Sequence, residues 1–214
     1  MKQNLRLVAG IILFGSIWGL LECALGDALH STVLPGGAIM TGLVGFGLMA
    51  ATRIMYRQPG MQLGMGALAG ALKYMHPVGG CMLCSAIAIA VEGVVFELIW
   101  RSPQLRLDRL DTISMRVSMG VISGYAMYGV GYIATQMLTP IVSGGPLIVA
   151  DLAVLMPRTL SHATLAGLLA GATLPALLAV PADLSERIAS VRKEVYYPAA
   201  SLISVLCWIG ILLL

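Results

Sequence analysis

The sequence contains few charged residues. Only 11% of its 214 residues are Asp, Glu, Lys or Arg, whereas soluble domains contain about 25%. The mean hydropathy is +0.91, and no long polar stretch separates the apolar ones. This shortage of charge excludes a soluble globular protein and leaves no room for a separate soluble domain. We therefore expect residues 1–214 to form a single transmembrane domain in a lipid bilayer.

Several functional motifs are also missing. The sequence has no Walker A motif, so the chain does not bind and hydrolyse ATP in that manner. It has neither GxSxG nor HExxH, which lowers the expectation of a hydrolase. No basic stripe with interleaved aromatic residues is present, so we expect no nucleic acid as a partner. These absences favour a transport or binding function over an enzymatic one.

Seven apolar stretches have about the length that crosses a bilayer. The sequence therefore predicts an all-α integral membrane protein, a bundle of six or seven transmembrane helices with Gly/Pro-rich outer loops. Residues 139–157 contain three prolines and Asp151, which predicts a re-entrant or interfacial outer segment. The predicted helices cover approximately residues 5–26, 33–52, 61–75, 82–100, 115–138, 159–180 and 196–214.

Basic residues are distributed asymmetrically. If alternate apolar stretches cross the membrane, 11 of the 13 Lys and Arg residues lie at one face. The positive-inside rule makes that face cytoplasmic. We therefore expect a multi-pass protein of the cytoplasmic (inner) membrane with a cytoplasmic N-terminus. The two exceptions, Lys73 and Arg158, fall at the outer face.

The outer face also gathers the three histidines and a Cys-x-x-Cys pair. Cys23, Asp27 and His30 share one face of the first helix, and each of the other two histidines follows a basic residue by three or four positions. There Lys73 and Arg158 could share a cavity with Cys81, where a cation could meet Asp27, Asp151 or an anionic ligand group. The predicted substrate-binding residues are Cys81, Cys84, His30, His76, Asp27, Lys73, Arg158, His162 and Glu92.

Glu92 lies near the middle of the fourth predicted helix. Ionisable groups in the apolar slab are costly, and they face a cavity or a partner. Two interpretations are open: a hydrogen-bonded packing residue that meets a polar side chain of another helix, and a ligand-binding or proton-carrying residue.

The Cys81–Cys84 pair is compatible with several kinds of chemistry. A thiolate together with a histidine could hold zinc, copper, or a metal inside a macrocycle. On the oxidising side of a membrane, the same pair could form a disulfide or a redox dithiol. A single Cys-x-x-Cys pair does not decide between these alternatives.

Small residues repeat at four-residue spacing in two of the predicted helices. Gly15 and Gly19 form one such pair, and Gly66 and Gly70 form another. This spacing lets helix backbones approach closely. It indicates internal packing by default, with docking of a partner subunit as the alternative.

The size, hydropathy and small-residue motif of the chain resemble the substrate-binding S-components of energy-coupling factor (ECF) transporters. The resemblance implies a ligand cavity built from outer loops and outer helix halves, and an energising transporter module as partner. The motif of the first helix would be carried by Gly15 and Gly19, where the family has alanines. S-components usually have six spans, whereas this sequence predicts seven with Leu214 outside.

Within that group, the segment HPVGGCMLC at 76–84 is similar to the cysteine-bearing region of BtuM-type cobalamin-binding proteins. The similarity implies that Cys81, or alternatively Cys84, is the axial ligand of a corrinoid cobalt. Gly79 and Gly80 would then let the loop approach the flat ring.

Two other functional classes stay open. The chain could be a redox protein that binds haem b through His30, His76 or His162, or one in which the two cysteines react with a quinone. It could also be a structural subunit of a larger membrane complex.

Overall fold

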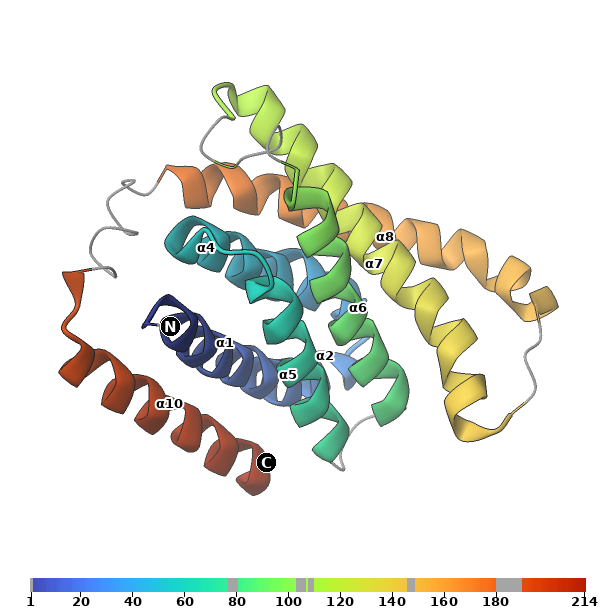
Figure 1. Ribbon diagram of the computed structural model, residues 1–214. Helices are drawn as coiled ribbons and strands as arrows, with labels where there is room; N and C mark the ends of the chain where they lie inside the picture. Colours follow the sequence, from blue (N-terminus) through green and yellow to red (C-terminus); the bar gives the residue numbers. More distant parts are fainter. Residues whose placement is uncertain (1, 77–80, 103–106, 108–109, 146–148, 180–189) are drawn as a thin grey trace.

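The computed structural model describes residues 2–76, 81–102, 107, 110–145, 149–179 and 190–214, and these residues form helices and no strands (Figure 1). Six of the described helices are long and apolar enough to cross a membrane. The chain is therefore an all-α, multi-pass membrane protein. The spans cover Leu5–Leu29, Gly36–Tyr56, Met82–Trp100, Ile113–Ser143, Ala153–Leu178 and Lys193–Leu213.

The first two spans each contain a π-helical segment. The first consists of α1 (Lys2–Leu21), η1 (Glu22–Gly26) and α2 (Asp27–His30), which follow one another without a break. The second consists of α3 (Gly36–Ile39), η2 (Met40–Gly45) and α4 (Phe46–Tyr56). A π-helical turn inserts an extra residue into an α-helix and is frequent at functional sites.

The remaining helices are α5 (Met61–Met75), α6 (Met82–Trp100), α7 (Ile113–Ser143), α8 (Val149–Leu178) and α10 (Lys193–Leu213). The predicted boundaries 61–75 and 82–100 agree with α5 and α6. With 15 residues, α5 is shorter than the spans above and packs between α1 and α6. The described chain thus has six spans and one shorter helix.

The prediction of a re-entrant segment at 139–157 is wrong for residues 139–143 and 149–157, which are helical; 146–148 lie outside the described residues, and the interfacial alternative stays a prediction. Helix α7 continues through Pro140 to Ser143, and α8 contains Pro157 well inside its length. Pro140 lies in the last turn of α7 and removes one backbone hydrogen bond there, and packing of α8 against α7 supports the helices around both prolines. Gly144 ends α7 with a φ of 72°, as expected for a glycine turn.

The N- and C-termini lie at opposite ends of the bundle (Figure 1). Two hydrogen bonds show that α10 runs parallel to α1. Arg6 Nη2 donates to the carbonyl oxygen of Val191, just before α10, at 2.7 Å. Further along both helices, Trp208 Nε1 donates to Ser16 Oγ at 2.8 Å. Parallel neighbours at the two ends of the chain imply an odd number of passes along the bundle.

The two ends of the bundle differ in their polar contacts. At the end where α4 and α6 finish, Arg53 Nη1 lies 3.2 Å from Glu97 Oε1, and Arg53 Nη2 donates to the carbonyl oxygen of Trp100 at 2.7 Å. We call this the basic end. The opposite end, where α5 finishes and α6 begins, is called the His76 end.

The four glycines of the small-residue motifs are buried between helices of this chain. A Cβ on Gly15 would lie 3.0 Å from Leu68, and one on Gly19 would lie 2.8 Å from Leu72, both on α5. Gly66 and Gly70 approach α6 in the same way, with a Cβ on Gly70 only 2.6 Å from the carbonyl oxygen of Ala86. Close internal packing accounts for both motifs, and docking of a partner at these glycines stays an untested prediction.

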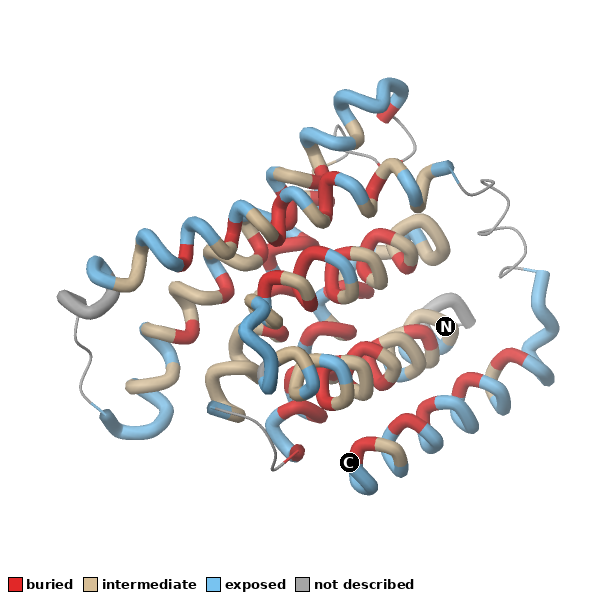
Figure 2. Tube along the Cα trace, turned by 180° about the vertical axis from the view of Figure 1, so that it is seen from behind, coloured by how far each residue is buried: buried red, intermediate tan, exposed pale blue. Residues whose placement is uncertain are grey.

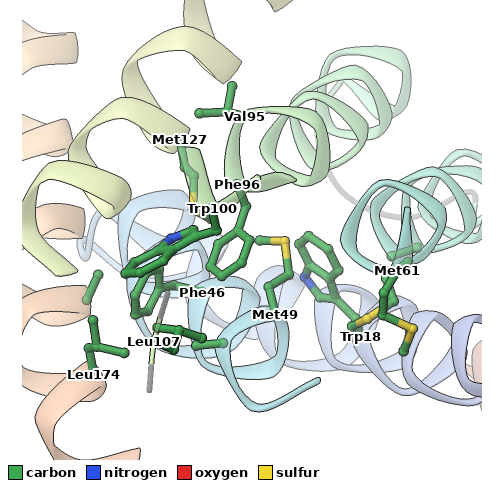
Figure 3. Close-up of a cluster of buried hydrophobic side chains, with 14 of the residues drawn as sticks. Trp18, Phe46, Met49, Met61, Val95, Phe96, Trp100, Leu107, Met127 and Leu174 are labelled. Atoms are coloured by element: carbon green, nitrogen blue, oxygen red, sulfur yellow. The ribbon is translucent and has the colours of Figure 1, made fainter. Parts of the chain in front are cut away.

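Aromatic and methionine side chains fill the centre of the bundle (Figure 3). Phe96 contacts both Phe46 and Trp100, with ring centroids 5.7 and 6.0 Å apart, and Met49 is fully buried beside them. The buried positions face inwards on every helix, whereas the outer faces are exposed (Figure 2). This core fixes the positions of the helices that surround the cavity described below.

Candidate functional site

A buried ion cluster joins the first span to α5 at the His76 end. Lys73 Nζ donates to Asp27 Oδ1 at 2.6 Å, and His76 Nε2 lies 3.0 Å from Asp27 Oδ2. Lys73 is 5% exposed and His76 is 2% exposed. Lys73 Nζ also lies 3.4 Å from the carbonyl oxygen of Glu22. The structure therefore brings together three of the predicted site residues as a neutralised polar group.

The two cysteines at the start of α6 form a disulfide. Cys81 and Cys84 are bonded with a Cα–Cα distance of 5.2 Å, and Cys81 Sγ accepts the backbone N–H of Cys84 at 3.2 Å, which caps the helix. This is one of the alternatives left open by the sequence. A disulfide sulfur is not a thiolate, so ligation of a metal by Cys81 requires reduction of this bond first.

His76 and His162 have different partners. His162 Nδ1 lies 3.2 Å from the hydroxyl of Tyr128, whereas His76 pairs with Asp27. Arg158 is exposed on α8. The side chain of His30 lies outside the described residues, as do Gly79 and Gly80. In the described part of the chain, no group of three or more His, Cys, Asp or Glu residues has a metal-binding arrangement.

A cavity of about 240 Å³ lies between the first two spans, α6 and α7. Its walls come from the ends of these helices nearest the His76 end: Cys84 belongs to the first turn of α6, and Gln136 is close to the end of α7. Glu92 is eight residues beyond Cys84, so the cavity extends about 12 Å along α6. The lining residues are Glu22, Gly37, Met40, Thr41, Cys84, Ser85, Ala88, Ile89, Glu92, Tyr128, Tyr132, Thr135 and Gln136.

Glu92 is the deepest ionisable residue of the cavity and is 4% exposed. Its Oε1 lies 2.6 Å from Thr41 Oγ1 on η2, whereas its Oε2 is buried without a hydrogen-bond partner. The bond to Thr41 agrees with the first interpretation made from the sequence, a packing residue that meets a polar side chain of another helix, whereas a ligand-binding or proton-carrying role stays a prediction. A buried acceptor without a partner is costly, so it marks Glu92 as a ligand-binding candidate.

Glu22 supplies a second carboxylate to the same cavity. It lies on η1, is 9% exposed, and its Oε1 accepts the indole N–H of Trp18 at 3.0 Å. Two carboxylates in one apolar cavity repel each other unless protons or a cation lie with them. Both π-helical segments contribute to this arrangement, since η1 carries Glu22 and η2 carries Thr41 and Met40.

The sequence predicted only part of this cavity. Of the nine predicted site residues, Cys84 and Glu92 line it. Glu22, Thr41, Tyr128 and Tyr132 were missed. Glu22 carried a usable signal, because a carboxylate inside an apolar span is rare; the others carried none.

Comparison with known proteins gives no match: no family model, no curated protein and no solved structure is similar to the chain.

Proposed function

We propose that the chain is a membrane protein that binds a small metabolite in the Glu22–Glu92 cavity and passes it across the bilayer. The observation that carries this proposal is the position of Glu92 in the wall of a 240 Å³ cavity inside a helical bundle, with its Oε2 buried and without a hydrogen-bond partner. An ionisable group at this depth belongs typically to a substrate or ion pathway. The cavity approaches the lower limit of the volume that ligand sites have, roughly 300 Å³.

The orientation follows from the charge distribution and is part of the proposal. The basic end faces the cytoplasm by the positive-inside rule, so the cavity belongs to the outer half of the protein. The solute would enter between Cys84 and Gln136, near the helix ends. The membrane is the cytoplasmic one. An energising transporter module, as the resemblance to S-components implies, would supply the free energy for uptake.

Corrinoid binding is a narrower version of the proposal. It needs a larger cavity than the one described and a reduced Cys81. The visible spectrum of the reduced protein mixed with cobalamin tests it: a bond between cobalt and sulfur shifts the spectrum, and Cys81→Ala and Cys84→Ala identify the ligand. Unchanged spectra in the wild-type protein exclude corrinoid ligation. The same spectrum tests the haem alternative, because haem gives a sharp Soret band.

The general proposal is tested by access of water-soluble reagents to the cavity. Ala88 lines the cavity, whereas Ala90 is on the α5 side of the same helix, where its backbone N is 3.5 Å from a Cβ placed on Gly70. Ala88→Cys and Ala90→Cys are reconstituted in liposomes and treated with methyl methanethiosulfonate. We expect modification of Ala88→Cys at a rate at least tenfold above that of Ala90→Cys.

The natural cysteines do not interfere with this experiment, because Cys23 and Cys207 are buried and the other two are paired. Equal, slow modification of the two variants would show that no solute enters the cavity and would exclude the proposal. Modification by membrane-impermeant reagents added to each side in turn distinguishes transport from binding alone. A transport protein is modified from both sides.

A further inference from the structure

The charge of the cavity restricts what it can bind. Among the described residues that line it, Glu22 and Glu92 are carboxylates and none is Lys, Arg or His. The other polar side-chain groups among them are the hydroxyls of Thr41, Ser85, Thr135, Tyr128 and Tyr132 and the amide of Gln136. An anionic solute would meet carboxylates in a medium of low dielectric constant, which is strongly unfavourable. A cation would neutralise them.

Some hydrogen-bond acceptors of the described lining residues receive no hydrogen bond. Glu92 Oε2 has no partner. The hydroxyl of Thr135 donates to the backbone oxygen of Tyr132 at 2.6 Å, which leaves its lone pairs free to accept. Both groups therefore keep acceptor capacity that no hydrogen bond of the described residues uses. A solute with N–H groups or a positive charge supplies what is missing.

Two aromatic rings complete the lining. Tyr128 and Tyr132 lie one turn apart on α7, with ring centroids 6.5 Å apart and an angle of 16° between their planes. The contact of the Tyr128 hydroxyl with His162 Nδ1 holds the first ring in place. Aromatic rings attract alkylammonium groups through the negative charge of their faces. Inorganic cations prefer rigid sets of oxygen ligands, in which such rings have no part.

The geometry points to a small organic ammonium ion as the solute of this cavity, with its charge beside Glu92 and Glu22 and its alkyl groups against Tyr128 and Tyr132. This inference rests on the proposed function and narrows its substrate class. The volume of about 240 Å³ admits an amine of a few carbon atoms.

Choline and 3,3-dimethylbutan-1-ol form a matched pair of probes, because they have the same shape and differ in charge. In the labelling experiment on Ala88→Cys, we expect choline to slow modification by at least tenfold at saturation, with tetramethylammonium acting in the same way. The neutral alcohol at the same concentration should have little effect. Sodium and potassium chloride at equal ionic strength serve as controls.

Substitutions of single lining residues test which of them bind choline. Glu92→Gln and Glu22→Gln keep the size of the side chain, and each should weaken choline binding, measured by calorimetry, by about tenfold or more. Tyr132→Leu should weaken it by about two- to fivefold, whereas Tyr132→Phe keeps the ring and should bind as the wild type does. Unfolding temperatures without ligand show whether each variant is folded, and the two Glu variants serve as independent tests.

The outcomes separate the two proposals. If Ala88→Cys is modified but choline and tetramethylammonium give no more protection than the alcohol, the cavity is a solute site and the ammonium inference is wrong. Equal protection by sodium or potassium would also overturn it, in favour of an inorganic cation. If Ala88→Cys is not modified at all, the proposed function itself fails.

Discussion

The Thr41 hydroxyl lies 2.6 Å from Glu92 Oε1 and 2.9 Å from the carbonyl oxygen of Gly37. A hydroxyl has a single hydrogen and therefore donates to one of these acceptors at a time. With an ionised Glu92, Thr41 donates to the carboxylate. With a protonated Glu92, the carboxyl group donates to Thr41, which then donates to Gly37. The direction in which the Thr41 hydroxyl donates therefore depends on the protonation state of Glu92.

Removal of this hydroxyl should destabilise the protein. Thr41→Val keeps the shape of the side chain but leaves Glu92 Oε1 without its partner, so we expect a loss of about 1–3 kcal/mol in the free energy of unfolding. Thr41→Ser keeps the hydroxyl and is the matched control. Denaturant titration of both variants in detergent checks the prediction, and equal stabilities would show that the hydrogen bond contributes nothing.

Removing one charge of the Lys73–Asp27 pair should lower the free energy of unfolding more than removing both. Asp27→Asn leaves the buried Lys73 ammonium without a counter-charge, and we expect a loss of about 3 kcal/mol or more. The double variant Asp27→Asn with Lys73→Met removes both charges and should be more stable than Asp27→Asn alone. Arg158→Met, at an exposed position, should change stability by less than about 0.5 kcal/mol. A double variant less stable than the single one would contradict this account of the cluster.

Two glycines of α7 provide a matched test of helix packing. A Cβ on Gly120 would lie 2.5 Å from the carbonyl oxygen of Ala170 on α8, whereas a Cβ on Gly129 meets nothing within 4 Å. Gly120→Ala should therefore cost about 1–3 kcal/mol because the two backbones must separate. Gly129→Ala should be neutral or stabilising by about 0.4–1 kcal/mol. Thermal unfolding of both variants measures the difference, and an equal effect would mean that the α7–α8 contact tolerates separation.

The parallel arrangement of α1 and α10 predicts the sidedness of the termini. Single-cysteine tags fused before residue 2 and after Leu214 should react with an impermeant maleimide from opposite sides of the membrane. By the positive-inside rule, the N-terminal tag reacts from the cytoplasmic side. Reaction of both tags from one side would require an even number of crossings and would exclude the seven-pass arrangement.

The fold was largely predictable because apolar length is a direct physical requirement of the bilayer. The boundaries of α5 and α6 followed from the Gly/Pro turns around them. The region of Pro140 and Pro157 was mispredicted, because a proline in a membrane helix is tolerated when neighbouring helices support the backbone. That support is a tertiary property, and a single sequence does not display it.

The candidate site was less predictable. Asp27 was one of three partners considered for Lys73 and Arg158 at the outer face, and the structure pairs it with Lys73. Most of the cavity lining was not predicted, because Tyr132 and Thr41 are ordinary helix residues until the π-helical segments and α7 place them at the same cavity as Glu92. A long-range pair such as Thr41 and Glu92, 51 residues apart, depends on how helices rotate against each other.

The length of α5 has a consequence for the surrounding lipid. Fifteen residues rise about 22 Å along a helix axis, whereas the hydrocarbon core of a typical bilayer is about 30 Å thick. Leu63 and Tyr74 are exposed on α5. We expect this face to meet acyl chains and the bilayer to be thinner beside it, so the protein should partition into thinner or shorter-chain lipid domains.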